Sequence, residues 1–405
     1  MAVATQAAVK LTERINRIEV SATMAVVAEA DKLRASGADL VDFGAGEPHF
    51  HTPQHIKDAA IAAIQGNFTR YTPVAGIAEL RDAIVKRHAA DFGSDYRREE
   101  SIAGTGGKHA LFNLVQVLVD HGDEVIIPVP YWVSFKDIVR YAGGVPVFVE
   151  SKEENGFAVT AEMVEKAVTP KTKLIILNSP NNPSGAVISQ EDMANIIRIA
   201  HRRGIYVLSD ECYVYLDYTG KRFSAGSLLD AKEHLLILGS LSKTYSMTGW
   251  RLGYALAPAP IVSAVQKLQS QCTSNPTSIV QKAAVAALNG SQEPVEQMRR
   301  EYIDLRNRIV EGLRSIPGIR CNMPDGAFYA FPNVSAFLGR GGLKSPGDVA
   351  RRLLHEAKVV AVPGEAFGTE EHIRVSYATS AGEIDRGIQR MRERYGNQKN
   401  NAQQQ

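Results

Sequence analysis

The chain has 405 residues, enough for two or three domains, and its 46 Lys and Arg residues nearly balance its 44 Asp and Glu residues. The basic residues are scattered along the chain, so nucleic acid is not expected as a partner. The three cysteines, Cys212, Cys272 and Cys321, are far apart in the sequence and allow neither a disulfide framework nor a CxxC metal pair. No apolar run approaches the ~20 residues that cross a bilayer, and residues 1–10 lack a targeting pattern, so we expect a cytoplasmic protein with no membrane partner.

Through the middle of the chain, short apolar runs rich in Val, Ile and Leu alternate with helical patterns. Strands are expected at 123–130, 145–150, 173–178, 205–210 and 234–240, and the helices between them include 108–122, 160–169 and 189–204. This alternation is typical of a buried, mostly parallel sheet. We therefore predict an α/β fold in which residues 50–290 form a large, doubly wound domain.

The remaining residues are assigned to a smaller α+β domain. Residues 291–396 begin with a charged helix at 293–316 and continue with glycine-rich turns and short strands. Residues 1–49 are expected to form an N-terminal arm and part of this smaller domain. Residues 397–405 are polar and are predicted to be a disordered tail.

Candidate ligand-binding residues follow the strands and open the helices. In a doubly wound sheet, ligands bind beyond the carboxyl ends of the strands. Gly107 and Lys108 open a helix whose free N–H groups could hold an anion, Asn182 lies in a turn after one strand, and Asp210 ends another. Each alone has an ordinary explanation as a tight turn or a helix cap.

The segment 240–251 adds an amine to this set. Lys243 lies among hydroxyl groups, and Arg251 follows it closely. A neighbouring cation disfavours the charged form of a lysine and leaves a better nucleophile, while hydroxyls with an arginine suit a phosphate. One ligand offers an aldehyde to Lys243, a phosphate to Arg251 and a basic ring nitrogen to Asp210. That ligand is pyridoxal 5'-phosphate.

The motifs that contain these residues resemble those of the class I, fold-type I aminotransferases. They run in order along nearly the whole chain: "FGAGEPHFHTP", "RYTPVAGIAELRDAI", "PYWVSF", "NSPNNPSG", "SDECY", "SLSKTYSMTGWRLGY", "DGAFYAF" and "HIRVSYATS". Within the family, the chain is most similar to the bacterial aspartate aminotransferase subgroup with lysine in the "GGK" segment. "SDECY" departs from the common pattern by having Cys212 where isoleucine is frequent, and we interpret this as a packing difference.

The resemblance implies a role for each candidate residue. Lys243, Asp210 and Tyr213 would be catalytic. The cofactor would be bound by Gly107, Lys108, Trp132, Asn182, Asp210, Tyr213, Ser240, Lys243, Arg251 and, across a dimer interface, the partner subunit's Tyr71. The substrate would be bound by Gly46, Lys108, Trp132, Asn182 and Arg374, of which Arg374 would clamp the α-carboxylate, with Ser21, Thr23 and a partner-subunit hydroxyl near Ser274 as additional contacts.

The resemblance also implies the reaction. It would be a ping-pong transamination between L-aspartate and 2-oxoglutarate, carried out by a homodimer with shared active sites. Lys108 is the candidate for the second carboxylate of an acidic substrate. Prephenate or aromatic amino acids are alternative substrates, and a pyridoxal-phosphate-dependent lyase is an alternative of a different reaction class. No metal is expected.

Overall fold

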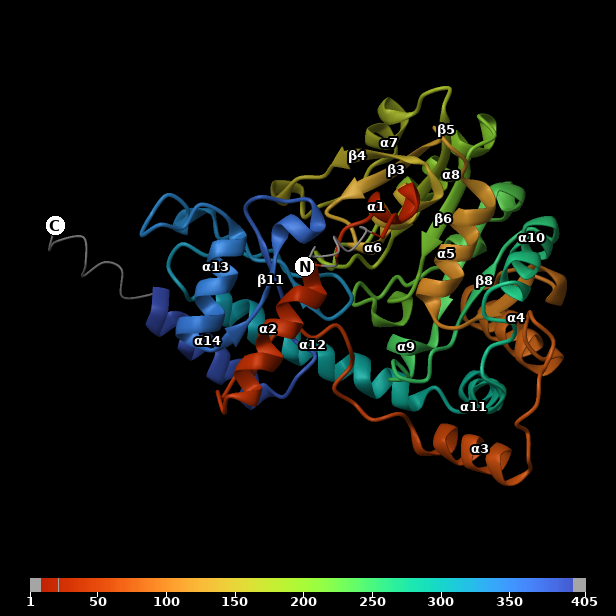
Figure 1. Cartoon of the computed structure of the whole chain (residues 1–405), viewed down its shortest axis with the longest axis horizontal. Helices are drawn as coiled ribbons and strands as arrows, with labels where there is room; N and C mark the ends of the chain where they lie inside the picture. The colour runs from red at the N-terminus through yellow and green to blue at the C-terminus, as the bar shows by residue number, and fades with distance from the viewer. Residues whose placement is uncertain (1–8, 21, 396–405) are drawn as a thin grey trace, which may run out of the picture.

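A seven-stranded sheet forms the centre of the fold in this computed structural model, which describes residues 9–20 and 22–395 (Figure 1). The strand order is β2-β8-β7-β6-β5-β3-β4. Neighbours from β7 to β4 are parallel, whereas β8 runs antiparallel to both β7 and β2. The predicted α/β fold with a mostly parallel sheet is therefore confirmed. The strands are β2 (Ser101–Gly104), β3 (Glu124–Val129), β4 (Val145–Glu150), β5 (Thr172–Asn178), β6 (Tyr206–Asp210), β7 (Leu235–Ser240) and β8 (Gly253–Leu256).

The inner strands of this sheet are apolar on both faces because helices cover both, whereas the edge strand β4 exposes Val145 and Phe148. Along β5, Leu174 and Ile176 belong to the core on one side, and Ile175 and Leu177 to the core on the other. The first core is completed by α5 (Gly107–Leu118), α6 (Ser134–Ala142) and α10 (Ala259–Ser270), and the second by α4 (Ala78–Phe92), α7 (Ala161–Ala167), α8 (Gln190–Arg202) and α11 (Ser278–Asn289). The predicted helices at 108–122, 160–169 and 189–204 correspond to α5, α7 and α8.

A second group of elements is built mainly from the C-terminal part of the chain (Figure 1). The predicted helix at 293–316 is α12 (Glu293–Arg314), and α13 (Pro346–Arg352) and α14 (Ala381–Tyr395) follow it. A three-stranded antiparallel sheet has the order β11-β12-β9, in which β11 is Val362–Pro363, β12 is Ile373–Ser376 and β9 is Tyr329–Ala330. This sheet contributes to the site described below.

Elements near the beginning of the chain contact both groups of elements. Helix α1 (Glu13–Asn16) lies against α6, and β1 (Val41–Asp42) pairs in parallel with β10 (Val359–Val360). The other α-helices are α2 (Ala22–Ala35), α3 (Gln54–Gln65) and α9 (Leu241–Thr244).

The domain limits at residues 49, 290 and 396 stay a prediction, and the tail at 397–405 lies outside the described residues. Within residues 9–20 and 22–395, no helix has the length and apolar character needed to span a membrane.

Candidate active site

A cavity of about 330 Å³ lies at the carboxyl ends of the parallel strands. The last residues of β5, β6 and β7 line it, because neighbouring parallel strands end at the same edge of a sheet. It is within the size range of small-molecule sites. The structure brings together at this cavity the following residues predicted from the sequence: Gly46, Gly107, Lys108, Trp132, Asn182, Asp210, Tyr213, Ser240, Lys243, Arg251 and Arg374.

One end of the cavity is suited to a phosphate. Helix α5 begins here at Gly107, so its first N–H groups have no partner within the helix. A Cβ atom on Gly106, whose φ is +90°, would lie 2.6 Å from Nη2 of Arg251, so the guanidinium packs directly against this bare turn. Arg251 Nη1 donates to the carbonyl of Thr248 at 2.8 Å, which fixes the side chain. A cation and free N–H groups therefore face the same volume.

The amine of Lys243 lies in the middle of the cavity. Its Nζ donates to the carbonyl of Gly46 and lies 5.8 Å from the ring centre of Phe328. Burial, with smaller contributions from Arg374 and Arg251, lowers the pKa of Lys243 to about 8. A larger fraction of this amine is therefore neutral near physiological pH than for a lysine in water, which makes it a better nucleophile and base.

Asp210 is a buried carboxylate at the end of β6, with only 3% of its surface exposed. Its Oδ1 accepts a hydrogen bond from the backbone N–H of Cys212 at 3.1 Å. No basic side chain of the described residues forms an ion pair with it, and burial raises the pKa of Asp210 to about 6. Since an unpaired buried carboxylate is unfavourable, a ligand with a cationic N–H would supply the partner that the protein does not.

Arg374 reaches the cavity from β12 of the three-stranded sheet. It is 3% exposed, and it donates from Nη1 to Oδ1 of Asn182 at 3.2 Å and from Nη2 to the carbonyl of Gly44 at 2.9 Å. Its guanidinium carbon lies 4.5 Å from the ring centre of Tyr329. The buried Nε has no hydrogen-bond partner in the described part of the chain. Contacts on several sides thus hold a guanidinium that still has a free donor.

The aromatic residues complete the walls of the cavity. Lys108 Nζ lies 5.1 Å from the ring centre of Trp132, and burial together with the nearby Arg251 lowers the pKa of Lys108. The hydroxyls of Tyr213 and Tyr329 are hydrogen-bonded at 2.9 Å. Burial raises the pKa of both tyrosines, so they face the cavity as neutral donors.

Four cationic side chains therefore face one cavity without an ion-pair partner. In the portion of the chain that the structure describes, none of Lys108, Lys243, Arg251 and Arg374 is within 4.0 Å of a carboxylate oxygen of another side chain. Such a concentration of positive charge is unfavourable unless an anionic ligand offsets it. A ligand with a phosphate at Arg251, a carbonyl at Lys243 and a ring nitrogen at Asp210 fits these residues, as pyridoxal phosphate does.

The family is decided by comparison with known proteins. The family model for aminotransferase class I and II matches residues 38–391. The chain belongs to this family. Aspartate aminotransferase from Geobacillus stearothermophilus is 46% identical over 94% of this chain and 98% of its own length. The aspartate/prephenate aminotransferase of Nitrosomonas europaea is 41% identical over 94% of this chain and 98% of its own. A solved structure of aspartate aminotransferase from Thermus thermophilus with maleate has 42% identity and a TM-score of 0.90, covering 94% of this chain and 98% of that one.

Membership of the class I and II aminotransferases makes this chain a transaminase and makes pyridoxal phosphate its cofactor. The residues at the cavity fit that cofactor, as argued above from their charges and burial. The fold-type I architecture expected from the sequence is confirmed by the likeness to solved aspartate aminotransferase structures.

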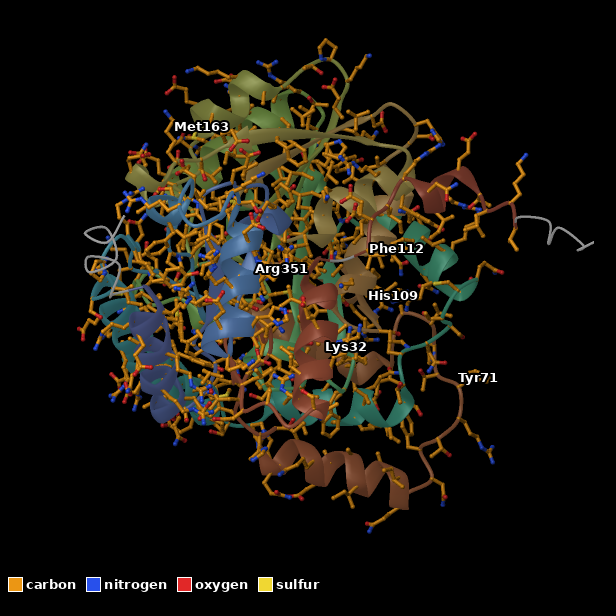
Figure 2. All side chains as sticks on the ribbon, turned by 60° about the vertical axis from the view of Figure 1, so that its left-hand side comes forward. Lys32, Tyr71, His109, Phe112, Met163 and Arg351 are labelled. Carbon is orange, nitrogen blue, oxygen red and sulfur yellow. The ribbon has the colours of Figure 1, made fainter. Side chains whose placement is uncertain are left out.

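Some residues expected at the aminotransferase site lie elsewhere or outside the description. Tyr71 is 92% exposed and projects away from the body of the chain (Figure 2), as a residue that acts across an interface would, but a single chain does not test that role. Ser274 of this chain does not line the cavity, and its expected contribution from the partner subunit stays a prediction. Ser21 lies outside the described residues, and the side chain of Thr23 is not described.

The structure also adds residues that the sequence analysis gave no role. Tyr329, Thr248 and Ser242 line the cavity. The signal for Tyr329 was present, because it lies within the aminotransferase motif "DGAFYAF". The Tyr329 ring faces the guanidinium of Arg374 because β9 pairs with β12, and this pairing cannot be inferred from the local sequence.

Proposed function

We propose that this aminotransferase transfers the amino group of L-aspartate to 2-oxoglutarate. The observation that carries the proposal is the set of four unpaired cations around Asp210 in one cavity. The cofactor phosphate and the substrate α-carboxylate engage Arg251 and Arg374, which leaves Lys108 for a second carboxylate. Relatives named aspartate aminotransferase, 46% and 44% identical to this chain, support the same substrate.

Lys243 and Asp210 carry the chemistry in this proposal. Pyridoxal phosphate supplies an electron sink that stabilises a carbanion at the substrate Cα. Lys243 would hold the cofactor at its aldehyde carbon, and its Nζ would accept the Cα proton of a bound substrate as the general base. Asp210, buried and otherwise unpaired, would hold a proton on the ring nitrogen, and Tyr213 would donate to the phenolic oxygen.

The other side chains orient the reactants. Ser240, Arg251 and the backbone of Gly107 and Lys108 hold the phosphate at the start of α5. Trp132 would stack on the ring, and Asn182, which accepts a hydrogen bond from Arg374, would donate to the phenolic oxygen. Arg374 binds the α-carboxylate, with the Gly46 backbone close by. Because a bidentate arginine–carboxylate pair is directional, it places the Cα–H bond relative to Lys243.

Prephenate is the second candidate acceptor. Relatives named aspartate/prephenate aminotransferase are 41% and 42% identical to this chain. Prephenate, like 2-oxoglutarate, carries a second carboxylate that Lys108 could bind. The charges of the cavity therefore suit both acids.

The half-reactions test the proposal directly. The absorbance of the purified holoenzyme should change to that of the amine form of the cofactor when L-aspartate is added alone, with one oxaloacetate formed per site. Addition of 2-oxoglutarate should restore the first spectrum and form glutamate. Recovery with prephenate as well would establish the dual activity. A continuous release of ammonia without the amine form would instead indicate a lyase and would contradict transamination.

We also propose that the active enzyme is a cytoplasmic homodimer in which the partner subunit's Tyr71 contributes to the phosphate site. The exposure of Tyr71 and its position on an extended loop support the interface, and three free cysteines suit a reducing compartment. Sedimentation should give a dimer, and Tyr71→Ala should weaken cofactor binding without altering the fold. A monomer with full activity would contradict this proposal.

A further inference from the structure

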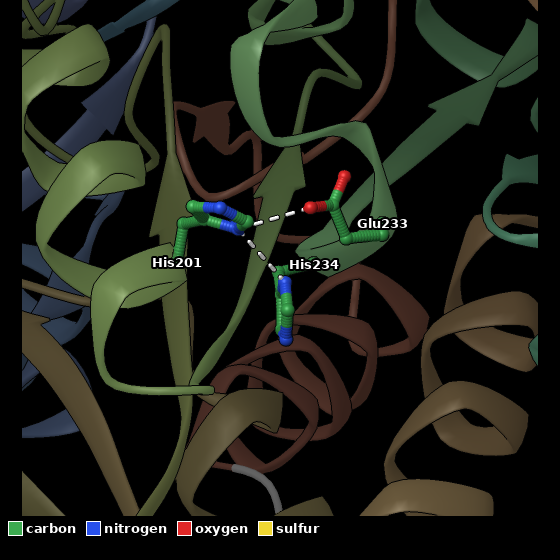
Figure 3. Close-up of side chains that lie close together, drawn as sticks. All are labelled: His201, Glu233 and His234. Carbon is green, nitrogen blue, oxygen red and sulfur yellow. Dashed lines mark hydrogen bonds and ion pairs between the residues drawn. The ribbon is translucent and has the colours of Figure 1, made fainter.

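Two histidines and a glutamate meet near the starts of β6 and β7, at the end of the sheet opposite to the active site. Figure 3 shows the three side chains. His201 is in the last turn of α8, and Glu233 and His234 immediately precede β7. Tyr206, the first residue of β6, packs against the His234 ring with 5.4 Å between ring centres. Since β6 has five residues with a rise of about 3.3 Å each, this cluster lies at least ~13 Å from Asp210.

The ligand atoms of the cluster are spaced like those of a metal site. His201 Nδ1 is 3.2 Å from His234 Nδ1 and 3.2 Å from Oε1 of Glu233. One such atom from each residue lies within 4.8 Å of the others. A tetrahedral zinc ion with ligands at about 2.0–2.1 Å requires ligand atoms roughly 3.3–3.4 Å apart. Two of the three separations are therefore already close to those of a coordinated ion.

The surroundings of the cluster favour a cation. His201 is at the carboxyl end of α8, where the helix dipole is negative. Of the basic groups nearby, Lys232 donates to Glu100 at 3.0 Å and Arg203 pairs with Glu165 at 3.7 Å, whereas Lys173 Nζ lies 5.7 Å from the ring centre of Tyr206. The side chains of His201 and Glu233 are 38% and 60% exposed, so an ion from solution can reach them.

We propose that His201, Glu233 and His234 form a binding site for a divalent transition-metal ion of the Zn²⁺ type. Imidazole nitrogens and a carboxylate are ligands that Zn²⁺ accepts. Three protein ligands leave one tetrahedral position open to water. This site is separate from the pyridoxal phosphate site and does not depend on the proposed substrate.

Titration of the tag-free holoenzyme with Zn²⁺ tests the proposal, and Co²⁺ reports the geometry through its visible absorbance. We expect one Zn²⁺ bound per chain at this cluster, a higher melting temperature, and a tetrahedral Co²⁺ spectrum. His201→Ala and His234→Ala should each weaken binding on the order of tenfold or more, and Glu233→Gln should weaken it as well. The aspartate half-reaction should be unchanged in all three variants, because the cluster is far from the cavity.

His355→Ala is the matched control. His355 also pairs with a carboxylate, Glu29, at 2.8 Å and is 45% exposed, but among the described residues it is not part of a cluster of metal-ligating side chains. This variant should bind Zn²⁺ as tightly as the unmodified protein. Absence of Zn²⁺ binding, or binding that both His201→Ala and His234→Ala retain, would overturn the proposal.

Discussion

Lys243→Ala should reduce kcat for aspartate transamination by about 10⁴-fold, because the variant lacks the amine that we propose both bonds to the cofactor and acts as the general base. The side chain contributes little to the apolar core, so we expect the protein to fold and to retain its melting temperature within a few degrees. Steady-state assays of the purified variant, together with its absorbance after addition of pyridoxal phosphate, give both readouts.

Lys86→Ala controls for the loss of a lysine as such. Lys86 is exposed on α4 and does not line the cavity. Its kcat should remain that of the unmodified enzyme. A Lys243→Ala variant that still turned over at a comparable rate would contradict the role of Lys243, whereas one that failed to fold would contradict the expectation that this side chain serves the chemistry and not the core.

Arg374→Ala should lower kcat/KM for aspartate roughly 10²- to 10⁴-fold, mainly through KM. In the proposed role of Arg374, the variant loses two charge-assisted hydrogen bonds to the substrate carboxylate. Each is worth about 1.5–3 kcal/mol, and each 1.4 kcal/mol corresponds to about a tenfold change. Initial rates over a range of aspartate concentrations measure the effect. The same loss is expected for every amino acid substrate, since the α-carboxylate is common to all.

Arg374→Lys separates charge from geometry. Lysine keeps the positive charge but cannot form the bidentate pair, so we expect an intermediate kcat/KM. Because Arg374 also donates to Asn182 and Gly44, the melting temperature of each variant must be compared with that of the unmodified protein. A KM for aspartate that is unchanged in folded Arg374→Ala would remove this residue from the proposed site.

The strands that the sequence predicted correctly are those with long, continuous apolar runs. Residues 174–177 of β5 face helices on both sides, and such burial leaves an unbroken pattern of Leu and Ile. Strands β2 and β8 were not predicted, because each has four residues including a glycine, and the pairing of β8 with β2 joins residues some 150 positions apart. Local periodicity cannot detect such a strand.

The candidate site could be predicted in part for a related reason. Asp210 and Ser240 are at strand ends, so the topology alone brings them to one edge of the sheet. Arg374 was assigned only from a family motif, since its approach depends on the three-stranded sheet. The contacts of Tyr329 and the meeting of His201 with His234 depend on tertiary packing between distant segments, and no periodicity or spacing in the sequence encodes them.

The cavity takes its side chains from two separate sheets, with Asp210 on β6 and Arg374 on β12. In the proposed site, an amino acid held by Arg374 and positioned over Lys243 therefore connects the two sheets. A displacement of one sheet by an ångström would change the angle at which the Cα–H bond meets the amine, and misplacements of that size cost rate as well as affinity. Residues that pack between the two sheets therefore affect the rate of proton transfer, because they fix the relative position of the sheets without touching the substrate.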